Sequence, residues 1–578
     1  VFPNQIDTTV YPSFGPGMFF APKTQNGYDD FTNNGIQFSV IRTNLLESAL
    51  NNSGSIALCM AYLETVKPYV LNLDQRCDHL VLIFEKMPPW LSSSSDNTVI
   101  PNTGYTVLNT KPPANWNTWQ TLVDSIVNKI NNQWGLDPYY EVWNEPDLFS
   151  WTGTPGEYFE LYRRTAAGLK NADPQAKIGG TAVNGWANQF GISAPAGFVS
   201  DSLADLSITA LLLDTCAANL LPIDFISWHQ FNFPVTELNR SVSFFRNKLQ
   251  TLGFPPLPII ISEWNCPSYA RETSVHPTFM IEFQKKSGEL GIEMNSVAAW
   301  QDFDSTAQEF HQDYGLISYG DLRKPAWNAM QLLNMLNGNI LNAVNASGVT
   351  AIPTRNADTL RILLSNYAPD PLISALSFVL YDNYFNVNDL ANAGYTTIGE
   401  LDSIFRGLIN LTGTDSLSLT LMAAQSIYSQ AEQNVTQIKN INLIIDGNST
   451  ALNGKIYVID TTNNNIIFRY DSLISAGYTQ ATATAFLQPN QSLNSSTISI
   501  TDSILGLQLR PNAVVLLELY GLPLSIAENT IKISSDQLKI FPNPASTAIS
   551  IALTGNSAPE KISIYDQNGK LIKTGMTR

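Results

Sequence analysis

The chain has 578 residues and a formal net charge of −17; 44% of its residues are hydrophobic and only 14% are charged. This length predicts about two or three domains with sizeable cores. The negative charge argues against nucleic acid or an anionic membrane as a partner. It also weighs against a sulfated or uronate-rich polymer, unless a local basic pocket overrides it.

The cysteines and the hydropathy of the chain bear on metal binding, disulfide formation and membrane insertion. The four cysteines show no metal-binding spacing, and we expect neither a metal nor a cofactor. Cys59 and Cys77 would pair in an oxidising compartment; the alternative is four buried free thiols. No run of 18 apolar residues occurs, so we expect no membrane insertion. The chain begins at Val1 rather than Met, which indicates a processed or truncated product.

Short apolar runs alternate with helical patterns from residue 14 to about residue 337. Such runs are typical of parallel strands that are buried on both faces. A capping box at Thr154-Pro155-Gly156-Glu157 predicts a helix through Lys170. Eight strand–helix units predict a (β/α)8 TIM barrel over residues 1–337. The predicted strands cover residues 14–20, 37–42, 79–84, 139–143, 177–180, 224–228, 258–262 and 296–300.

Beyond residue 338 the pattern changes to strands separated by Asn, Gly, Ser and Pro clusters. We interpret residues 338–525 as a β-sandwich accessory domain with an insertion near 372–438, in which 423–439 has a helical pattern. Residues 536–578 form a further unit, a short C-terminal β segment. An Asn568-Gly569 turn predicts a hairpin there.

Two glutamates, 118 residues apart, each end an apolar run that the barrel would place at its carboxyl-terminal face. Glu145 lies in Asn144-Glu145-Pro146 and Glu263 in Ser262-Glu263-Trp264. Paired carboxylates suit glycosidic bond cleavage, with Glu145 as acid/base, Glu263 as nucleophile and Asn144 on the sugar 2-hydroxyl. The alternatives are a helix N-terminus for Glu145 and a salt bridge for Glu263.

The same mechanism makes two physical predictions. The two carboxyl groups should lie about 5–5.5 Å apart for retention, whereas a gap near 9 Å would indicate inversion. An acid catalyst must also hold its proton near the working pH, so we expect a raised pKa for Glu145.

Other polar and aromatic residues at strand ends are candidates for the same site. His229 would orient a carboxylate or bind a hydroxyl, and Arg42 would hold the nucleophile ionised or bridge a surface acid. Trp300 would stack on a sugar face or pack in the barrel. We also expect substrate contacts from Trp264, Asn44 and Trp90. Further aromatic residues lie just past strand ends and line either the cleft or the core: Phe149, Trp151, Trp186 and Phe231.

Motifs in order along the chain resemble glycoside hydrolase family 39, which includes β-xylosidases and α-L-iduronidases. They are the segments 140–148, 157–162, 172–174, 177–180, 224–229, 261–265 and 324–327, and more weakly 363–367 and 456–460. The resemblance implies a retaining double displacement, with Glu145 as acid/base and Glu263 as nucleophile, in a pocket around one terminal sugar. Two segments differ from the family pattern. Arg42-Thr43-Asn44 lacks the histidine of the β-xylosidases, and residues 309–315 replace a glycine-rich stretch.

The tail is similar to a type IX secretion sorting domain of Bacteroidetes, through Phe541-Pro542-Asn543-Pro544 and residues 564–570. That similarity implies a secreted or cell-surface protein. We therefore expect a retaining glycosidase that acts on neutral poly- or oligosaccharides, with β-xylosidase-like exo activity favoured. The alternatives are an endo-acting or different-sugar glycosidase and, from another class, a non-catalytic carbohydrate-binding protein. The oligomeric state is left open.

Overall fold

The structure is a computed structural model that divides into two compact units, residues 1–521 and 522–578. It describes residues 13–16, 38–101, 103–303, 308–343, 348–445, 451–501, 504–522, 562–565 and 571–575.

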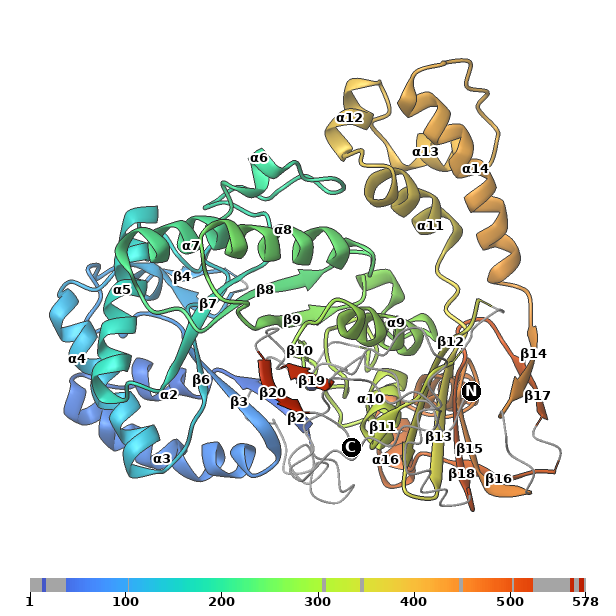
Figure 1. The fold of residues 1–578 in the computed structure, drawn as a ribbon, viewed down its shortest axis with the longest axis horizontal. Coiled ribbons are helices and arrows are strands. Elements are labelled where there is room, and N and C mark those ends of the chain that lie inside the picture. The colour runs from blue at the N-terminus through green and yellow to red at the C-terminus, as the bar shows by residue number, and fades with distance from the viewer. Residues whose placement is uncertain are drawn as a thin grey trace. The chain divides into compact units, whose positions relative to one another are not determined.

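Eight parallel strands form a barrel in the first unit (Figure 1). Starting from β2, the hydrogen-bonded order is β2, β3, β6, β7, β8, β9, β10, β1, so neighbours in the chain are neighbours in the sheet. Each strand predicted from the sequence has a counterpart in this sheet: β7, β8 and β9 extend beyond their predicted ends, β10 ends at Val297 rather than at residue 300, and residues 17–20 of the first predicted strand lie outside the described residues. The strands are β1 (Ser13–Pro16), β2 (Phe38–Thr43), β3 (Cys77–Phe84), β6 (Tyr139–Val142), β7 (Lys177–Val183), β8 (Phe225–Phe231), β9 (Ile259–Asn265) and β10 (Met294–Val297).

The barrel is nearly closed between its first two strands. A Cβ atom on Gly15 of β1 would lie 1.7 Å from the carbonyl oxygen of Val40 on β2, so only glycine permits this approach. Side chains from six strands fill the interior in one cluster, as expected for a packed barrel core. They are Val40, Val81, Tyr139, Phe225, Ile260 and Met294.

Helices surround the barrel strands (Figure 1). The capping box predicted at Thr154 is confirmed: its side chain accepts from the backbone of Glu157, whose carboxylate accepts from the backbone of Thr154. A π-helical stretch, Asn128–Gln133, continues α4. The helices are α2 (Leu46–Asn51), α3 (Ile56–Asp74), α4 (Trp116–Val127), α5 (Pro155–Ala172), α6 (Asp201–Ala204), α7 (Ile208–Asn219), α8 (Glu237–Thr251), α9 (Val275–Glu289) and α10 (Pro325–Met335); a short ribbon pairs β4 (Val99–Ile100) with β5 (Tyr105–Thr106).

After α10 the chain forms a six-stranded antiparallel sheet in the order β11, β12, β13, β18, β15, β16. One face packs against the barrel, because Leu363, Tyr457 and Leu516 belong to the main core cluster. β14 (Lys439–Ile444) and β17 (Ile504–Leu509) form a separate ribbon; the sandwich and its domain borders stay predictions. The sheet consists of β11 (Asn339–Ile340), β12 (Thr350–Asn356), β13 (Thr359–Ser365), β15 (Leu452–Ile459), β16 (Ser495–Ile500) and β18 (Val514–Tyr520), with α15 (Ile466–Ser475) and α16 (Gln480–Leu487) after β15.

The insertion near 372–438 is a helical group with its own apolar core around Ile404 and Leu421. It contains α11 (Pro371–Ser377), a π-helical stretch (Phe378–Asp382), α12 (Val387–Asn392), α13 (Ile398–Phe405) and α14 (Ser416–Asn434). The backbone nitrogen of Phe198, in the connection after β7, donates to the carbonyl of Phe385 at 2.8 Å. The insertion therefore joins the barrel at its carboxyl-terminal side.

In the second unit, β19 (Ile562–Tyr565) pairs antiparallel with β20 (Leu571–Gly575), and the C-terminal β segment as a unit stays a prediction. The turn residues Asn568 and Gly569, and the motif 541–544, lie outside the described residues. In the described part of the chain, no helix combines the length and apolar character that crossing a bilayer requires. All four cysteines are buried free thiols, so the pairing of Cys59 with Cys77 is not found.

Candidate active site

A sharp backbone turn after β6 positions Glu145. Trp143 and Glu145 have φ angles of 70° and 48°, which non-glycine residues rarely adopt. The backbone nitrogen of Glu145 donates to the carbonyl of Ala182 at 2.9 Å. The hydroxyl of Ser150 donates to the carbonyl of Glu145 at 2.7 Å and fixes the turn from its other side. The strain is thus held by specific bonds at the place where Glu145 enters the site.

The carboxylate of Glu145 is held by two neighbours on the next strands. Asn184, directly after β7, donates from Nδ2 to Oε1 at 2.7 Å. His229 on β8 places Nδ1 3.0 Å from the same oxygen. The Glu145 side chain is 17% exposed, whereas His229 is fully buried. Glu145 is therefore the member of this group that an incoming ligand reaches.

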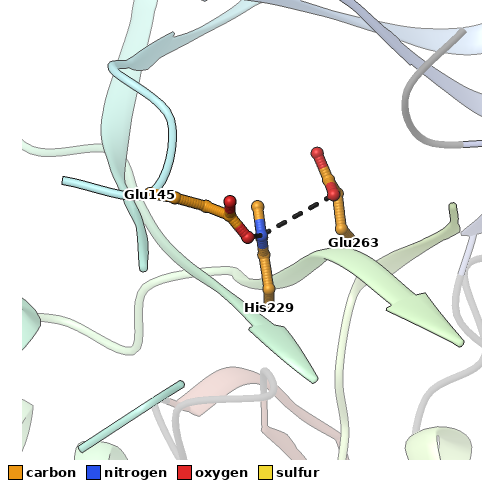
Figure 2. A group of neighbouring side chains, drawn as sticks. All are labelled: Glu145, His229 and Glu263. Carbon is orange, nitrogen blue, oxygen red and sulfur yellow. Dashed lines mark hydrogen bonds and ion pairs between the residues drawn. The ribbon is translucent and has the colours of Figure 1, made fainter. Parts of the chain in front are cut away.

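Glu263 lies on β9, opposite His229 of β8 in the strand register. One carboxylate oxygen of Glu263 lies 3.7 Å from His229 Nδ1, and its other oxygen accepts a short ion-paired hydrogen bond from Arg42. Oxygens of Glu145 and Glu263 and a nitrogen of His229 all lie within 4.8 Å of one another. Figure 2 shows the two carboxylates converging on the imidazole from β9 and from the turn after β6.

Arg42, near the end of β2, bonds to three side chains of the site, those of Glu141, Asn144 and Glu263. Its Nε donates to Glu141 at 2.6 Å and its Nη2 donates to the carboxamide oxygen of Asn144 at 2.9 Å. The side chains of Arg42, Glu141 and Glu263 are at most 4% exposed. Two buried carboxylates around one guanidinium require this pairing, because an isolated buried charge is costly. The structure thus brings together Arg42, Asn144, Glu145, His229 and Glu263.

The pKa values of the group differ from the expectation for Glu145. Burial would raise the pKa of Glu145, but the hydrogen bond and charge of His229, with Asn184 and Arg42, hold it below its ordinary value. Burial raises the pKa of Glu263 against the opposing pull of His229 and Arg42. The imidazole pKa is also raised, because both carboxylates outweigh its burial. The predicted raised pKa of Glu145 is therefore wrong for the ligand-free site.

The geometry of Glu145, His229 and Glu263 would also suit a metal ion, since each offers one ligand atom. Arg42 weighs against this use of the site. Its guanidinium is bonded to Glu263, where it occupies a carboxylate oxygen and repels a cation. Glu145, His229 and Glu263 are therefore better explained as a hydrogen-bonded group that shares a proton than as a metal site.

Two of the predicted tryptophans are fully buried. Trp264 faces away from Glu263 because neighbouring residues of a strand point to opposite faces. Its ring stacks on Phe283 of α9 at 3.9 Å, and its Nε1 donates to Asn295 at 2.9 Å. Substrate binding by Trp264 is therefore corrected to packing between barrel and helix. Trp300 is 1% exposed and meets Phe38 edge-on at 5.8 Å; its stacking on a sugar stays a prediction.

Asn44 and Trp90 have protein partners of their own. Asn44 donates from Nδ2 to Glu47 at 3.0 Å, and Glu47 is ion-paired with Lys86 at 2.5 Å. Trp90 is half-buried and donates from Nε1 to the hydroxyl of Ser53 at 3.0 Å. Their contacts with substrate stay predictions.

Among the other aromatic candidates, Phe231 lies closest to the described cluster, with its ring 5.9 Å from that of His229. Phe149 packs edge-on against Tyr105, and Trp151 against Trp143. Trp186 donates from Nε1 to the buried carboxyl of Glu237 at 2.7 Å. Phe231 therefore lies next to the cluster, whereas Trp151 and Trp186 pack in the core.

Glu237 carries a prediction about stability. Burial raises its pKa from 4.5 to about 8, so the folded chain holds a proton there that the unfolded chain has lost. Stability should therefore fall as pH rises from about 4.5 to 8, by about 3 kcal/mol at pH 7. We expect Glu237→Gln to remove this decline, measured as the free energy of unfolding in urea at pH 5, 6, 7 and 8. An unchanged slope would contradict the assignment.

Sequence reasoning missed Asn184 and Glu141. Asn184 directly follows β7, which ends at Val183. The predicted strand ended at residue 180, so Asn184 was not recognised as a polar residue at a strand end. Glu141 was hidden because it lies inside an apolar run, and only the partner Arg42 explains its burial. Tyr314 was also missed; its ring packs edge-on against Phe231 at 5.6 Å, and the sequence offers no signal for that contact.

Comparison with known families matches both parts of the chain. The family model "Glycosyl hydrolases family 39" matches residues 80–375, just over half of the 578 residues. The model "Secretion system C-terminal sorting domain" matches residues 539–578. A sorting domain of this type directs export, so the protein is secreted or displayed at the cell surface.

The chain is similar to two β-xylosidases. It is 24% identical to one from Caldicellulosiruptor saccharolyticus over 348 residues, which is 55% of this chain and 65% of the relative. It is 26% identical to one from Geobacillus stearothermophilus over 290 residues, 45% of this chain and 53% of the relative. The matches thus span less than two thirds of either relative.

Solved structures share the fold over most of the chain. A monomeric β-xylosidase from Caulobacter crescentus CB15 has a TM-score of 0.64 at 16% identity and covers 90% of this chain and 98% of its own. A family 39 enzyme from Xanthomonas axonopodis pv. citri has a TM-score of 0.63 at 18% identity, with the same coverage. At these identities the likeness concerns the fold.

Proposed function

Because the chain belongs to family 39 of the glycosyl hydrolases, and is thus a glycosidase, we propose that it cleaves neutral poly- or oligosaccharides with retention of configuration. The observation that carries this proposal is the approach of the Glu145 and Glu263 carboxylates to within 4.8 Å, with His229 between them. That gap suits direct attack on an anomeric carbon. An inverting enzyme instead separates its two carboxyl groups by about 6.5–9.5 Å to hold a water between them.

The two steps assign opposite roles to the two carboxyl groups. In the first, Glu263 attacks the anomeric carbon while Glu145 gives its proton to the departing glycosidic oxygen, leaving a glycosyl ester on Glu263. In the second, Glu145 takes a proton from water, the hydroxide oxygen bonds to the anomeric carbon, and Glu263 leaves as a carboxylate. Asn144, tied to Arg42 through its carbonyl oxygen, supplies an amide donor for the 2-hydroxyl.

For the first step to occur, substrate binding must raise the pKa of Glu145 relative to that of Glu263. In the ligand-free site the pKa of Glu145 is lowered and that of Glu263 is raised, the reverse of what the first step needs. A sugar over the 17% exposed Glu145 side chain would displace water and raise the pKa of that carboxyl. His229, bonded to Glu145 and 3.7 Å from Glu263, is placed to hold the shared proton.

This proton balance predicts different pH profiles for kcat/KM and kcat. The first reports the free enzyme and the second the substrate complex. Because the pKa of free Glu145 is lowered and substrate raises it, the basic limb of kcat should lie at higher pH than that of kcat/KM. Both are measured on a glycoside with a poor leaving group. Basic limbs at the same pH would show that substrate binding does not change the pKa of Glu145.

We infer β-xylosidase-like exo activity, supported by the two similar β-xylosidases. One observation favours the alternative of a different sugar or endo action. Asn44 stands where the family's β-xylosidases carry a histidine, and its amide is directed to Glu47 within an ion pair with Lys86. The surroundings of Asn44 therefore include a charge pair, Glu47 with Lys86.

Product stereochemistry tests the mechanism, and a substrate panel tests the specificity. Proton NMR during hydrolysis of an aryl β-xyloside should show the β-anomer of xylose first, with the α-anomer appearing only by mutarotation. First appearance of the α-anomer would refute retention. Hydrolysis of other nitrophenyl glycosides but not xylosides would keep the mechanism and replace the sugar.

A further inference from the structure

A further carboxyl group, that of Glu85, lies at the mouth of the barrel, directly after β3. Val81 of β3 belongs to the cluster that fills the barrel interior, whereas Leu82 and Phe84 belong to the core cluster that also contains the surrounding helices. Because side chains alternate along a strand, Glu85 lies on the same face as Val81. Glu85 therefore points inward at the carboxyl-terminal end of the barrel, where a barrel of this type has its active site.

Glu85 is also a neighbour of Asn144 across two adjacent strands. The carbonyl of Phe84 accepts a hydrogen bond from the backbone nitrogen of Trp143 at 2.9 Å, so the end of β3 runs beside the turn after β6. Glu85 and Asn144 each follow directly after one member of this bonded pair. The carboxyl of Glu85 thus belongs to the wall of the site next to Asn144.

One carboxyl oxygen of Glu85 has a protein partner and the other has none. Glu85 is 7% exposed, and its Oε1 accepts a short hydrogen bond from the hydroxyl of Tyr105. Its Oε2 accepts no hydrogen bond from the residues that the structure describes, and it is not enclosed by them. A carboxyl that is buried to this extent with one oxygen unpaired is costly. A ligand hydroxyl at the barrel mouth would satisfy that oxygen.

The surroundings hold Glu85 in place before any ligand arrives. Tyr105, from β5, is 6% exposed, and its ring packs edge-on against that of Phe149 at 5.4 Å. The ammonium of Lys86 lies 4.4 Å from the centre of the Tyr105 ring and is ion-paired with Glu47 at 2.5 Å. The charge of Lys86 is therefore directed to Glu47, and Tyr105 fixes Glu85. A group held in this way loses little conformational freedom on binding.

Electrostatic coupling links Glu85 and Tyr105 to the residues of the proposed reaction. Burial raises the pKa of Glu85 to about 7, and Arg42 is among the groups that oppose this rise. Burial also raises the pKa of Tyr105, and Glu145 is among the carboxyls that add to the rise. Both residues are thus close enough to the site to sense its charges.

The geometry of a sugar ring decides which of its hydroxyls Glu85 can meet. The proposed reaction places C1 between Glu145 and Glu263 and the 2-hydroxyl at Asn144. Glu85 lies beyond Asn144 on the next strand, so it is placed for the ring carbons that follow C2. A hydroxyl both donates and accepts hydrogen bonds, so it can pair with Glu85 in either protonation state of the carboxyl.

We propose that Glu85 is a specificity-determining residue whose Oε2 binds a hydroxyl on C3 or C4 of the terminal sugar. Tyr105 is its positioning residue. This inference rests on the proposed glycosidase function, because it requires a sugar whose C1 lies between Glu145 and Glu263. It adds to that function a requirement on the substrate, which must carry a free hydroxyl at the position that Glu85 binds.

A cycle with one change in the enzyme and one in the substrate tests the proposal. 4-Nitrophenyl β-xyloside and its 2-, 3- and 4-deoxy analogues, or the same set for the sugar that the substrate panel selects, are hydrolysed by wild type and by Glu85→Ala. Loss of the 3- or the 4-hydroxyl should lower kcat/KM roughly 10–100-fold more in wild type than in the variant. The intrinsic reactivity of each analogue cancels in this comparison. The 2-deoxy penalty should be the same in both enzymes, because Asn144 is unchanged.

A second variant and a control separate binding from folding. Glu85→Met combined with Tyr105→Phe replaces both bonded partners by apolar groups of similar shape, and it should lose the same discrimination as Glu85→Ala. Glu237→Ala is the matched control, because Glu237 is 3% exposed and is likewise bonded to an aromatic side chain, that of Trp186. It should keep the wild-type ratios. Thermal unfolding verifies that each variant is folded.

The outcomes distinguish this role of Glu85 from the proposed function. The role is overturned if the 3-deoxy and 4-deoxy penalties stay unchanged in the Glu85 variants, or if the 2-deoxy penalty falls with them. Either result leaves the retaining mechanism standing, because product NMR tests it independently on wild type. A wild-type chain that hydrolyses no nitrophenyl glycoside would overturn both the proposed function and the role of Glu85.

Discussion

Glu263→Gln is expected to lower kcat by roughly 10⁴-fold or more on every glycoside the protein cleaves. The amide keeps the size of the side chain but cannot form the glycosyl ester, and the ion pair with Arg42 is lost as well. Because attack is needed whatever the leaving group, aryl and alkyl glycosides should suffer alike. Steady-state rates on both substrate types measure this loss.

Glu160→Gln is the matched control for this experiment. Glu160 lies on α5 and is paired with Arg163 and Arg164 at the surface, so the same chemical change is made away from the site. It should leave kcat within about twofold of wild type, since exposed ion pairs contribute little. A Glu263→Gln enzyme with more than a tenth of wild-type activity would contradict the nucleophile assignment.

Glu145→Gln is expected to produce a loss that depends on the leaving group. General acid catalysis contributes roughly 10²–10⁴-fold, and only a poor leaving group needs it. The rate on an alkyl glycoside or xylobiose should fall by that factor, whereas the first step on a dinitrophenyl glycoside should change little. With the dinitrophenyl substrate the second step becomes limiting, because water then lacks its base.

Burst kinetics distinguish this result from simple misfolding. A rapid release of dinitrophenol equal to the enzyme concentration, followed by slow turnover, is expected for Glu145→Gln. Added azide needs no general base and should speed the slow phase. Equal losses on good and poor leaving groups, with no burst, would show that Glu145 is not the acid/base.

Much of the barrel was predictable because its strands are continuous apolar runs, and the candidate site residues follow from where those runs end. Glu145 and Glu263 could be located in this way, and Arg42 and His229 as their neighbours across β2 and β8. Trp264 was misassigned because it follows Glu263 directly, although strand alternation turns adjacent side chains to opposite faces.

The remaining features depend on contacts between distant residues. The lowered pKa of Glu145 follows from bonds to His229 and Asn184, 84 and 39 residues away. Local sequence does not contain that geometry. The helical insertion was equally hard to place, because its position depends on a backbone contact between Phe198 and Phe385, for which the residue types give no signal.

Trapping of the covalent intermediate tests the central claim most directly. An activated 2-deoxy-2-fluoro glycoside slows both steps by destabilising their positively charged transition states, and its good leaving group lets the ester accumulate. Intact-protein mass, followed by peptide mapping, then identifies the labelled residue. The account predicts one sugar per chain, attached to Glu263; a sugar on any other residue, or hydrolysis without a covalent adduct, would contradict it.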